Sequence, residues 1–209
     1  MTTATATEVT VPLLDLKAQY ATIRAEVEPV VLEVLESQYF IGGPKVDELE
    51  RDTAAYCRAK HAVGCANGSD AIVLALQALD VGPGDEVIMP SFTLFATAGS
   101  VHRLGARPVF VEVTDDLVLD FADLAVKARA TGARVLMLSH MRGHVCDMDA
   151  LMALCADLGV QVIEDCAIGA PTPFWTRVQD HDRLCGLPGP IEMNCGMPFD
   201  TVSVMRSGP

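Results

Sequence analysis

An α/β protein built on a mostly parallel sheet is the fold class that the sequence predicts for residues 1–167. Short, nearly all-apolar runs alternate with longer segments whose apolar residues recur at helical spacing. Such runs are typical of strands that helices cover on both faces. Turns such as Gly82-Pro83-Gly84-Asp85 separate the segments. Right-handed crossovers then place helices on both sides of the sheet and give three layers.

The first elements are expected to be two helices. Ile23, Val27 and Leu35 belong to an apolar set at helical spacing, which predicts a helix over residues 16–37. Phe40-Ile41-Gly42-Gly43 interrupts that helix. Pro44 suits the first position of a second helix, because its missing N–H has no helical partner there.

Beyond residue 60, strands and helices are expected to alternate. Each expected strand is a short apolar run, and each expected helix has a wider apolar stripe. Gly159 is well placed to end the last helix. Strands are predicted at 61–66, 86–89, 108–113, 134–139 and 160–164, and helices at 68–79, 93–105, 121–130 and 148–158.

The segment 168–209 differs from the rest in composition. It holds half of the chain's twelve prolines, and phrases such as Leu187-Pro188-Gly189-Pro190 have neither helical nor strand periodicity. We therefore expect a partial α/β domain over 1–167 and an atypical, irregular tail over 168–209. A reading-frame shift or truncation just after Ala167 is the hypothesis that this abrupt change suggests.

Bulk composition narrows the classes of function. The net charge of −13, with no cluster of Lys or Arg, argues against nucleic-acid binding. Neither a membrane-spanning run nor a signal peptide is evident, so a cytoplasmic protein that does not enter the membrane is expected. The seven cysteines are odd in number and form no C-x-x-C pair, which favours buried thiols in a reducing compartment.

Two candidate ligand-binding positions lie where expected strands meet loops. Gly68 and Ser69 open a helix, where backbone N–H groups and the helix dipole suit a phosphate. An ordinary N-cap by Asn67 or Ser69 is the competing interpretation. Asp165 ends an apolar strand at the edge where α/β proteins bind ligands, although a loop or capping aspartate is common there as well.

The stretch from Ser139 to Asp149 leads from a strand into a helix at the same edge. His140, His144 and Cys146 are potential metal ligands, but Gly143 interrupts helical spacing and no second cysteine pair completes a site. We therefore expect no metal there, and histidines that line a small-molecule cleft. A helix start at Asp147 and Asp149 is the competing interpretation of the acidic pair.

Taken together, several motifs resemble the DegT/DnrJ/EryC1/StrS family of pyridoxal-phosphate-dependent sugar aminotransferases. The resemblance covers roughly residues 11–167. It rests on Val11-Pro12-Leu13-Leu14-Asp15-Leu16, Phe40-Ile41-Gly42-Gly43-Pro44, Asn67-Gly68-Ser69-Asp70-Ala71, Gly82-Pro83-Gly84-Asp85-Glu86-Val87, Pro90-Ser91-Phe92-Thr93, Asp147-Met148-Asp149 and Glu164-Asp165-Cys166-Ala167.

This resemblance implies the large domain of the aspartate-aminotransferase-like fold (fold type I), in part, and a homodimer. It implies transfer of an amino group from glutamate or glutamine to a nucleotide-linked keto sugar, with pyridoxal 5'-phosphate as cofactor. Gly68 and Ser69 match the positions that bind the cofactor phosphate, and Asp165 matches the one that holds the pyridine nitrogen. His140 to His144 matches a loop near the cofactor. Leu94 stands where the family usually has an aromatic ring over the cofactor.

The family's Schiff-base lysine has no counterpart in the printed chain. Its four lysines, Lys17, Lys45, Lys60 and Lys127, all precede Asp165. We therefore expect no catalytic lysine and an inactive chain when it is alone, so that its status as an enzyme is open. Two alternatives stay open: a lysine-less sugar dehydratase, for which His181 is the one histidine after Asp165, and a non-catalytic partner subunit of an intact homologue.

Overall fold

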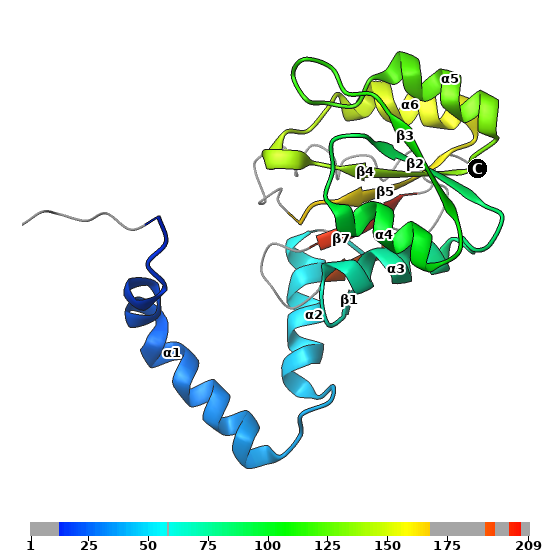
Figure 1. Ribbon diagram of the computed structural model, residues 1–209. Helices are drawn as coiled ribbons and strands as arrows, with labels where there is room; N and C mark the ends of the chain where they lie inside the picture. Colours follow the sequence, from blue (N-terminus) through cyan, green and yellow to red (C-terminus); the bar gives the residue numbers. More distant parts are fainter. Residues whose placement is uncertain (1–12, 58, 168–190, 195–200, 206–209) are drawn as a thin grey trace, which may run out of the picture. The chain divides into compact units, whose positions relative to one another are not determined.

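The structure is a computed structural model, and it describes residues 13–57, 59–167, 191–194 and 201–205 (Figure 1). The chain divides into two compact units, Met1–Pro44 and Lys45–Pro209. In the first unit, α1 (Leu16–Ser37) begins at Asp15, whose side chain accepts a hydrogen bond from the N–H of Ala18 at 2.9 Å. No residue of α1 is buried.

The second unit is a sheet with helices between its strands. Its helices are α2 (Pro44–Tyr56), α3 (Gly68–Ala78), α4 (Phe95–Arg103), α5 (Phe121–Thr131) and α6 (Met148–Leu158), with a 3₁₀ turn, η1, at Met141–Gly143. Its strands are β1 (His61–Gly64), β2 (Glu86–Pro90), β3 (Arg107–Val111), β4 (Val135–Ser139), β5 (Gln161–Asp165), β6 (Ile191–Asn194) and β7 (Thr201–Met205).

The strands form one sheet in the order β1-β6-β7-β5-β4-β2-β3. All pairings are parallel except those of β7, which runs antiparallel to β5 and to β6. Among the described strands, β1 joins the sheet only through β6. Because β1, β2, β4 and β5 run in one direction, their carboxyl ends lie at a single edge of the sheet.

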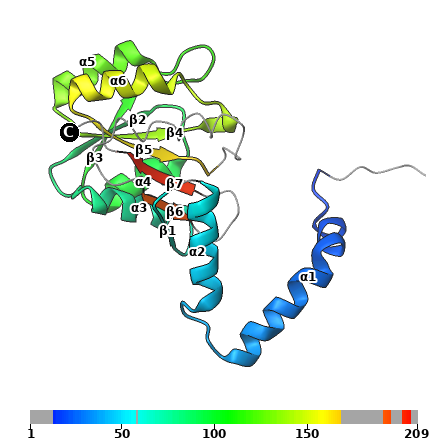
Figure 2. The same ribbon diagram turned by 180° about the vertical axis from the view of Figure 1, so that it is seen from behind.

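Helices cover both faces of this sheet, as Figures 1 and 2 show, with α3 and α4 on one side and α5 and α6 on the other. Alternate strand residues supply the two cores. Met89 and Ile163 pack with the α3–α4 layer, whereas Ile88 and Val162 pack with the α5–α6 layer. The three-layer, mostly parallel architecture expected from the sequence is thereby confirmed.

The structure differs from the expected domain organisation in two respects. The sequence predicts an irregular tail over 168–209, yet β6 and β7 lie within it and complete the sheet. The boundary between compact units falls after Pro44 and not after Ala167. The composition of the whole segment did not indicate these strands, because it is dominated by prolines and glycines that lie outside 191–194 and 201–205. Within the described ranges, no helix is both long enough and apolar enough to span a membrane.

Candidate functional site

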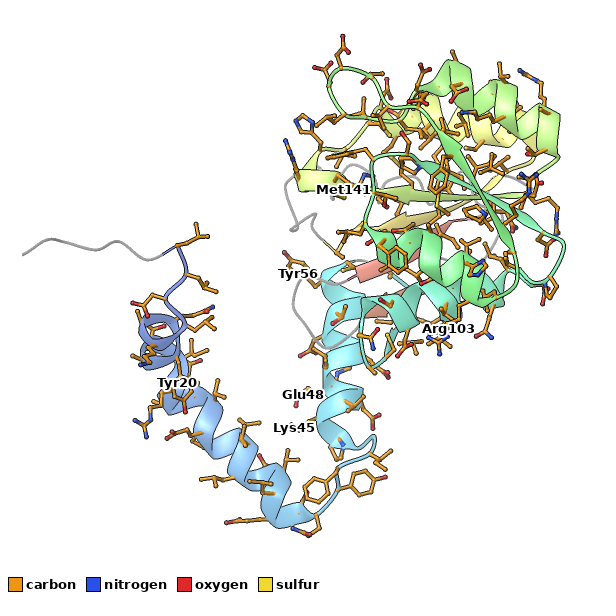
Figure 3. The ribbon with its side chains drawn as sticks, viewed as in Figure 1. Tyr20, Lys45, Glu48, Tyr56, Arg103 and Met141 are labelled. Atoms are coloured by element: carbon orange, nitrogen blue, oxygen red, sulfur yellow. The ribbon has the colours of Figure 1, made fainter. Side chains whose placement is uncertain are left out.

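The candidate site lies at the sheet edge formed by the carboxyl ends of the parallel strands. Four chain segments meet there: the start of α3 after β1, the start of α4 after β2, η1 after β4, and the end of β5. Met141, the first residue of η1, marks this edge in Figure 3. Ligands of open α/β sheets bind at such an edge, beyond the strand ends.

Asp165, the last residue of β5, is a buried side chain of the site that hydrogen bonds hold in place. It is 6% exposed. Its Oδ1 accepts from the N–H of Ala167 at 3.1 Å, and its Oδ2 accepts from the hydroxyl of Thr97 at 3.5 Å. The backbone N–H of His140 donates to its carbonyl at 3.0 Å. These bonds orient a carboxylate that burial has largely removed from water.

A chain of hydroxyl groups leads from Asp165 across the strand ends. Thr97 Oγ1 lies 3.1 Å from Thr93 Oγ1, which in turn lies 2.7 Å from Ser139 Oγ. Thr97 is fully buried, on the face of α4 that meets the sheet. The motifs that predict the site do not include Thr97. A signal was available, because Thr93, Thr97 and Ser100 form a polar stripe at helical spacing.

The start of α3 offers the features of an anion site. Asn67 caps the helix, with its Oδ1 accepting from the N–H of Asp70 at 2.9 Å, so the N-cap interpretation holds for Asn67 and not for Ser69. No acceptor in the described part of the chain meets the N–H groups of Gly68 and Ser69. Ser100 of α4 donates to the carbonyl of Ser69 at 3.3 Å. One face of α4 therefore contacts both Asp165 and the start of α3.

His140 and His144 lie in different environments, although they are four residues apart. His140 is 3% exposed, and its Nε2 lies 2.7 Å from Oε2 of Glu164. His144 is exposed, and its Nδ1 lies 3.3 Å from the carbonyl oxygen of Asp116. The two histidines do not line one cleft together, since the His140 ring is turned into the protein. Sequence spacing alone could not reveal that Glu164 is buried and hydrogen-bonded to the His140 ring.

Leu94 occupies the N-cap position of α4 and is 44% exposed. The adjacent Phe95 is 89% exposed, and its ring lies over Gly99 one turn further along the helix. The Leu94 side chain thus lies at the edge of the site and is partly exposed. The Phe95 ring, in contrast, lies along the surface of α4.

Two thiols near the site, Cys146 and Cys155, are not activated. Burial, reinforced by the negative charge of Glu164, raises the pKa of Cys146 to about 12. Burial alone raises the pKa of Cys155 to about 12. Both thiols stay protonated at neutral pH, so neither acts as a thiolate nucleophile.

Comparison with known proteins agrees with this geometry. The sequence profile of the DegT/DnrJ/EryC1/StrS aminotransferase family matches residues 21–178. The chain belongs to this family. The match begins ten residues later than the motif resemblance, and it extends past Ala167.

Curated members of the family align over the same region. The chain is 49% identical over 163 residues to a "Pleiotropic regulatory protein" of Geobacillus stearothermophilus, covering 77% of this chain and 44% of that protein. It is 44% identical over 157 residues to the dTDP-3-amino-3,4,6-trideoxy-alpha-D-glucose transaminase of Streptomyces venezuelae, covering 75% and 41%. The chain thus spans less than half the length of these relatives.

Solved structures of the family share the fold. S. venezuelae DesV, in complex with a ketimine intermediate, superposes with a TM-score of 0.76 at 37% identity, over 95% of this chain and 54% of that one. A family aminotransferase from Brucella abortus gives 0.77 at 27% identity, over 94% and 55%. The fold is that of the pyridoxal-phosphate-dependent aminotransferases of fold type I, over about half of the family's chain.

Proposed function

We propose that this chain provides the cofactor-binding part of a pyridoxal 5'-phosphate-dependent aminotransferase that acts on a nucleotide-linked keto sugar. The observation that carries the proposal is Asp165, a buried and doubly hydrogen-bonded carboxylate at the carboxyl edge of the sheet. The similarity to a dTDP-sugar transaminase and to a UDP-N-acetyl-3-dehydro-alpha-D-glucosamine 3-aminotransferase supports the substrate class.

The chemistry of the donors fits this cofactor. A buried carboxylate matches a protonated pyridine nitrogen, and Asp165 would hold that nitrogen. The N–H groups of Gly68 and Ser69, at the start of α3, would bind the phosphate. Helix α4 contacts both positions, through Thr97 and Ser100, and Leu94 at its start would cover the ring with an apolar side chain. When bound, the cofactor supplies an electron sink for the transfer of an amino group.

We further propose that the printed chain alone does not complete transamination. None of its four lysines lies after Asp165. Of these, Lys127 lies on α5 with its Nζ 2.7 Å from a carboxylate oxygen of Asp123, and Lys45 lies in α2, 3.7 Å from Glu48. The amine that would anchor the cofactor covalently is therefore absent from the printed sequence, which leaves binding by hydrogen bonds and charge.

Pyridoxamine 5'-phosphate is the probe that tests cofactor binding, because its binding needs no lysine. Titration calorimetry of the full chain is expected to show binding. Asp165→Asn should weaken it by about tenfold or more, as expected for loss of a charge-assisted hydrogen bond. Asp157→Asn, at an exposed position on α6, is the matched control and should bind as the wild type does. Equal affinity in the Asp165 variant and the control would contradict the proposed role.

A second candidate function is that of a non-catalytic partner subunit. The relative with 49% identity carries the name of a regulatory protein and not of a transaminase, which favours this alternative. Co-expression of the tagged chain with a full-length aminotransferase of the family would test it. A stable hetero-oligomer with changed transaminase activity is expected from a partner subunit, whereas no association would leave the first function.

A further inference from the structure

Three side chains that commonly bind metals converge behind the candidate site. They are His140, Glu164 and Cys166, and their ligand atoms all lie within 4.8 Å of one another. Each is buried, with 3%, 1% and 1% of the residue exposed, respectively. Their functional groups are an imidazole, a carboxylate and a thiol, which are the three donor types that bind zinc in proteins.

The strand register explains why they converge. Glu164 and Cys166 are two residues apart, so they point to the same face at the end of β5. Leu138 of β4 pairs with Glu164, and His140 is two residues beyond Leu138, which brings His140 to that face too. Leu138 and Val162 pack with the α5–α6 layer, so this is the α5–α6 face of the sheet.

Asp165 points to the opposite face. It contacts Thr97 of α4, in the α3–α4 layer. The three-residue group is thus separated from the proposed cofactor position by the sheet itself, and it is a site of its own.

Among the described residues, only one of the two Glu164 side-chain oxygens has a hydrogen-bond partner. Oε2 lies 2.7 Å from Nε2 of His140, whereas Oε1 is buried and has no hydrogen-bond partner among the described residues. An ionised carboxylate with an unsatisfied oxygen in the protein interior is unfavourable by several kcal/mol, unless a cation or a donor compensates it. This orphaned oxygen lies within the group of potential ligands and is the second observation that points to a bound cation.

We propose that His140, Glu164 and Cys166 bind one Zn²⁺ ion that joins the ends of β4 and β5. Zinc would take the place of the hydrogen bond between His140 and Glu164, and the Cys166 thiol would lose its proton on binding. The ion with one carboxylate and one thiolate leaves no net charge in the interior. Two ligand atoms bound to one tetrahedral Zn²⁺ ion lie about 3.3 to 3.7 Å from each other. Small shifts of the three side chains would therefore bring their ligand atoms to these distances.

This site differs from the one considered for the loop after β4. Of His140, His144 and Cys146, only His140 belongs to the buried group. His144 lies against the Asp116 carbonyl, and Cys146 lies 3.7 Å from the sulfur of Met148. The ligands come from two strands that are adjacent in space and distant in sequence, which no local spacing rule would find.

Cobalt and zinc binding to the full chain would test the proposal. The starting protein should carry Cys185→Ser and Cys195→Ser, so that thiols outside the described residues do not contribute. Addition of Co²⁺ is expected to produce a thiolate-to-metal charge-transfer band in the near ultraviolet, which one equivalent of Zn²⁺ removes. Cys166→Ala should abolish the band and weaken Zn²⁺ binding by at least about tenfold, since even loss of a partner behind a ligand costs about 10- to 100-fold.

Two further variants separate ligation from folding. Cys155→Ala removes a buried free thiol of α6, outside the group, and should leave the band and the zinc affinity unchanged. Glu164→Gln keeps the shape of the side chain while removing its charge, and should weaken zinc binding. If Cys166→Ala folds, by circular dichroism, and still binds Zn²⁺ like the starting protein, the proposed site is wrong. Absence of any cobalt band in the starting protein would overturn it equally.

Discussion

The Asp165 carboxylate is held from two directions, by the N–H of Ala167 in its own strand end and by the hydroxyl of Thr97 from α4. The first bond is local, and the second joins positions far apart in the sequence. Thr97 in turn contacts Thr93, whose hydroxyl contacts Ser139. The orientation of one acid thus depends on a hydroxyl network that spans α4, β4 and β5.

Thr97→Val should loosen Asp165 while keeping the shape of the buried side chain. Loss of this hydrogen bond is expected to weaken pyridoxamine phosphate binding by roughly fivefold, equivalent to about 1 kcal/mol. Thr97→Ser retains the hydroxyl and should restore most of the affinity. Calorimetric titration of the two variants checks this, and equal affinities for both would show that Thr97 does not position Asp165.

Single positions in the site were predictable where the local chain decides them. Asp165, Gly68 and Ser69 follow from strand ends and a helix start, and the structure brings these elements to one edge. The partnership of His140 with Glu164, and of Thr97 with Asp165, depends on which residues face each other across strands and layers. Periodicity carries no such information. The binding roles of these residues remain predictions.

At the level of elements, helix caps explain much of the agreement between expected and observed boundaries. The N-caps Asn67, Asp120 and Asp147 each accept a hydrogen bond from the first turn of a helix. Gly132 and Gly159 end α5 and α6 in the left-handed region. These caps are short-range chemistry, which a sequence displays directly. Strands β6 and β7 have no helix cap to mark them, and four or five residues are a weak strand signal within a segment rich in proline and glycine.

Gly159→Ala should destabilise the fold through the backbone alone. Gly159 has a φ of +67°, and an added Cβ would meet no atom of the described residues within 4 Å. An expected loss of about 1 kcal/mol, the penalty for alanine in the left-handed region, corresponds to a fall in Tm of roughly 2 to 4 °C. Thermal unfolding by circular dichroism measures it.

Gly82→Ala is the matched control for this change. A Cβ added at Gly82 would also be clear of every described atom by more than 4 Å, but the φ of this residue lies outside the left-handed region. This variant should keep its Tm or gain slightly, because alanine restricts the unfolded chain. A similar loss in both variants would contradict the assignment of the cost to backbone conformation.

For the whole molecule, the distribution of apolar surface is uneven. The second unit has two buried cores, whereas α1 buries none of its residues. Ile23, Val27 and Val31 are 41%, 39% and 51% exposed and lie on one stripe of that helix. Exposed apolar side chains on one stripe of a helix favour association with other apolar surfaces.

Self-association of the isolated chain is the expected result of this surface. Sedimentation velocity should show species larger than a monomer at increasing protein concentration. The double variant Ile23→Glu/Val27→Glu should lower that association, because it places two charges on the stripe. Ala25→Glu, on the opposite side of α1, is the control and should associate as the wild type does. Monomeric behaviour of the wild-type chain at all concentrations would contradict the prediction.

The pairing of β1 through β6 has a consequence for the order of events during synthesis. His61 of β1 pairs with Ile191 of β6, so β1 leaves the ribosome long before its neighbour exists. Strands β2 to β5 pair with one another and can assemble earlier. Contacts between distant segments slow folding and leave unpaired strand edges exposed in the meantime. The start of α3, with its proposed phosphate site, directly follows β1, so completion of the binding edge waits until residues 191–194 have been made.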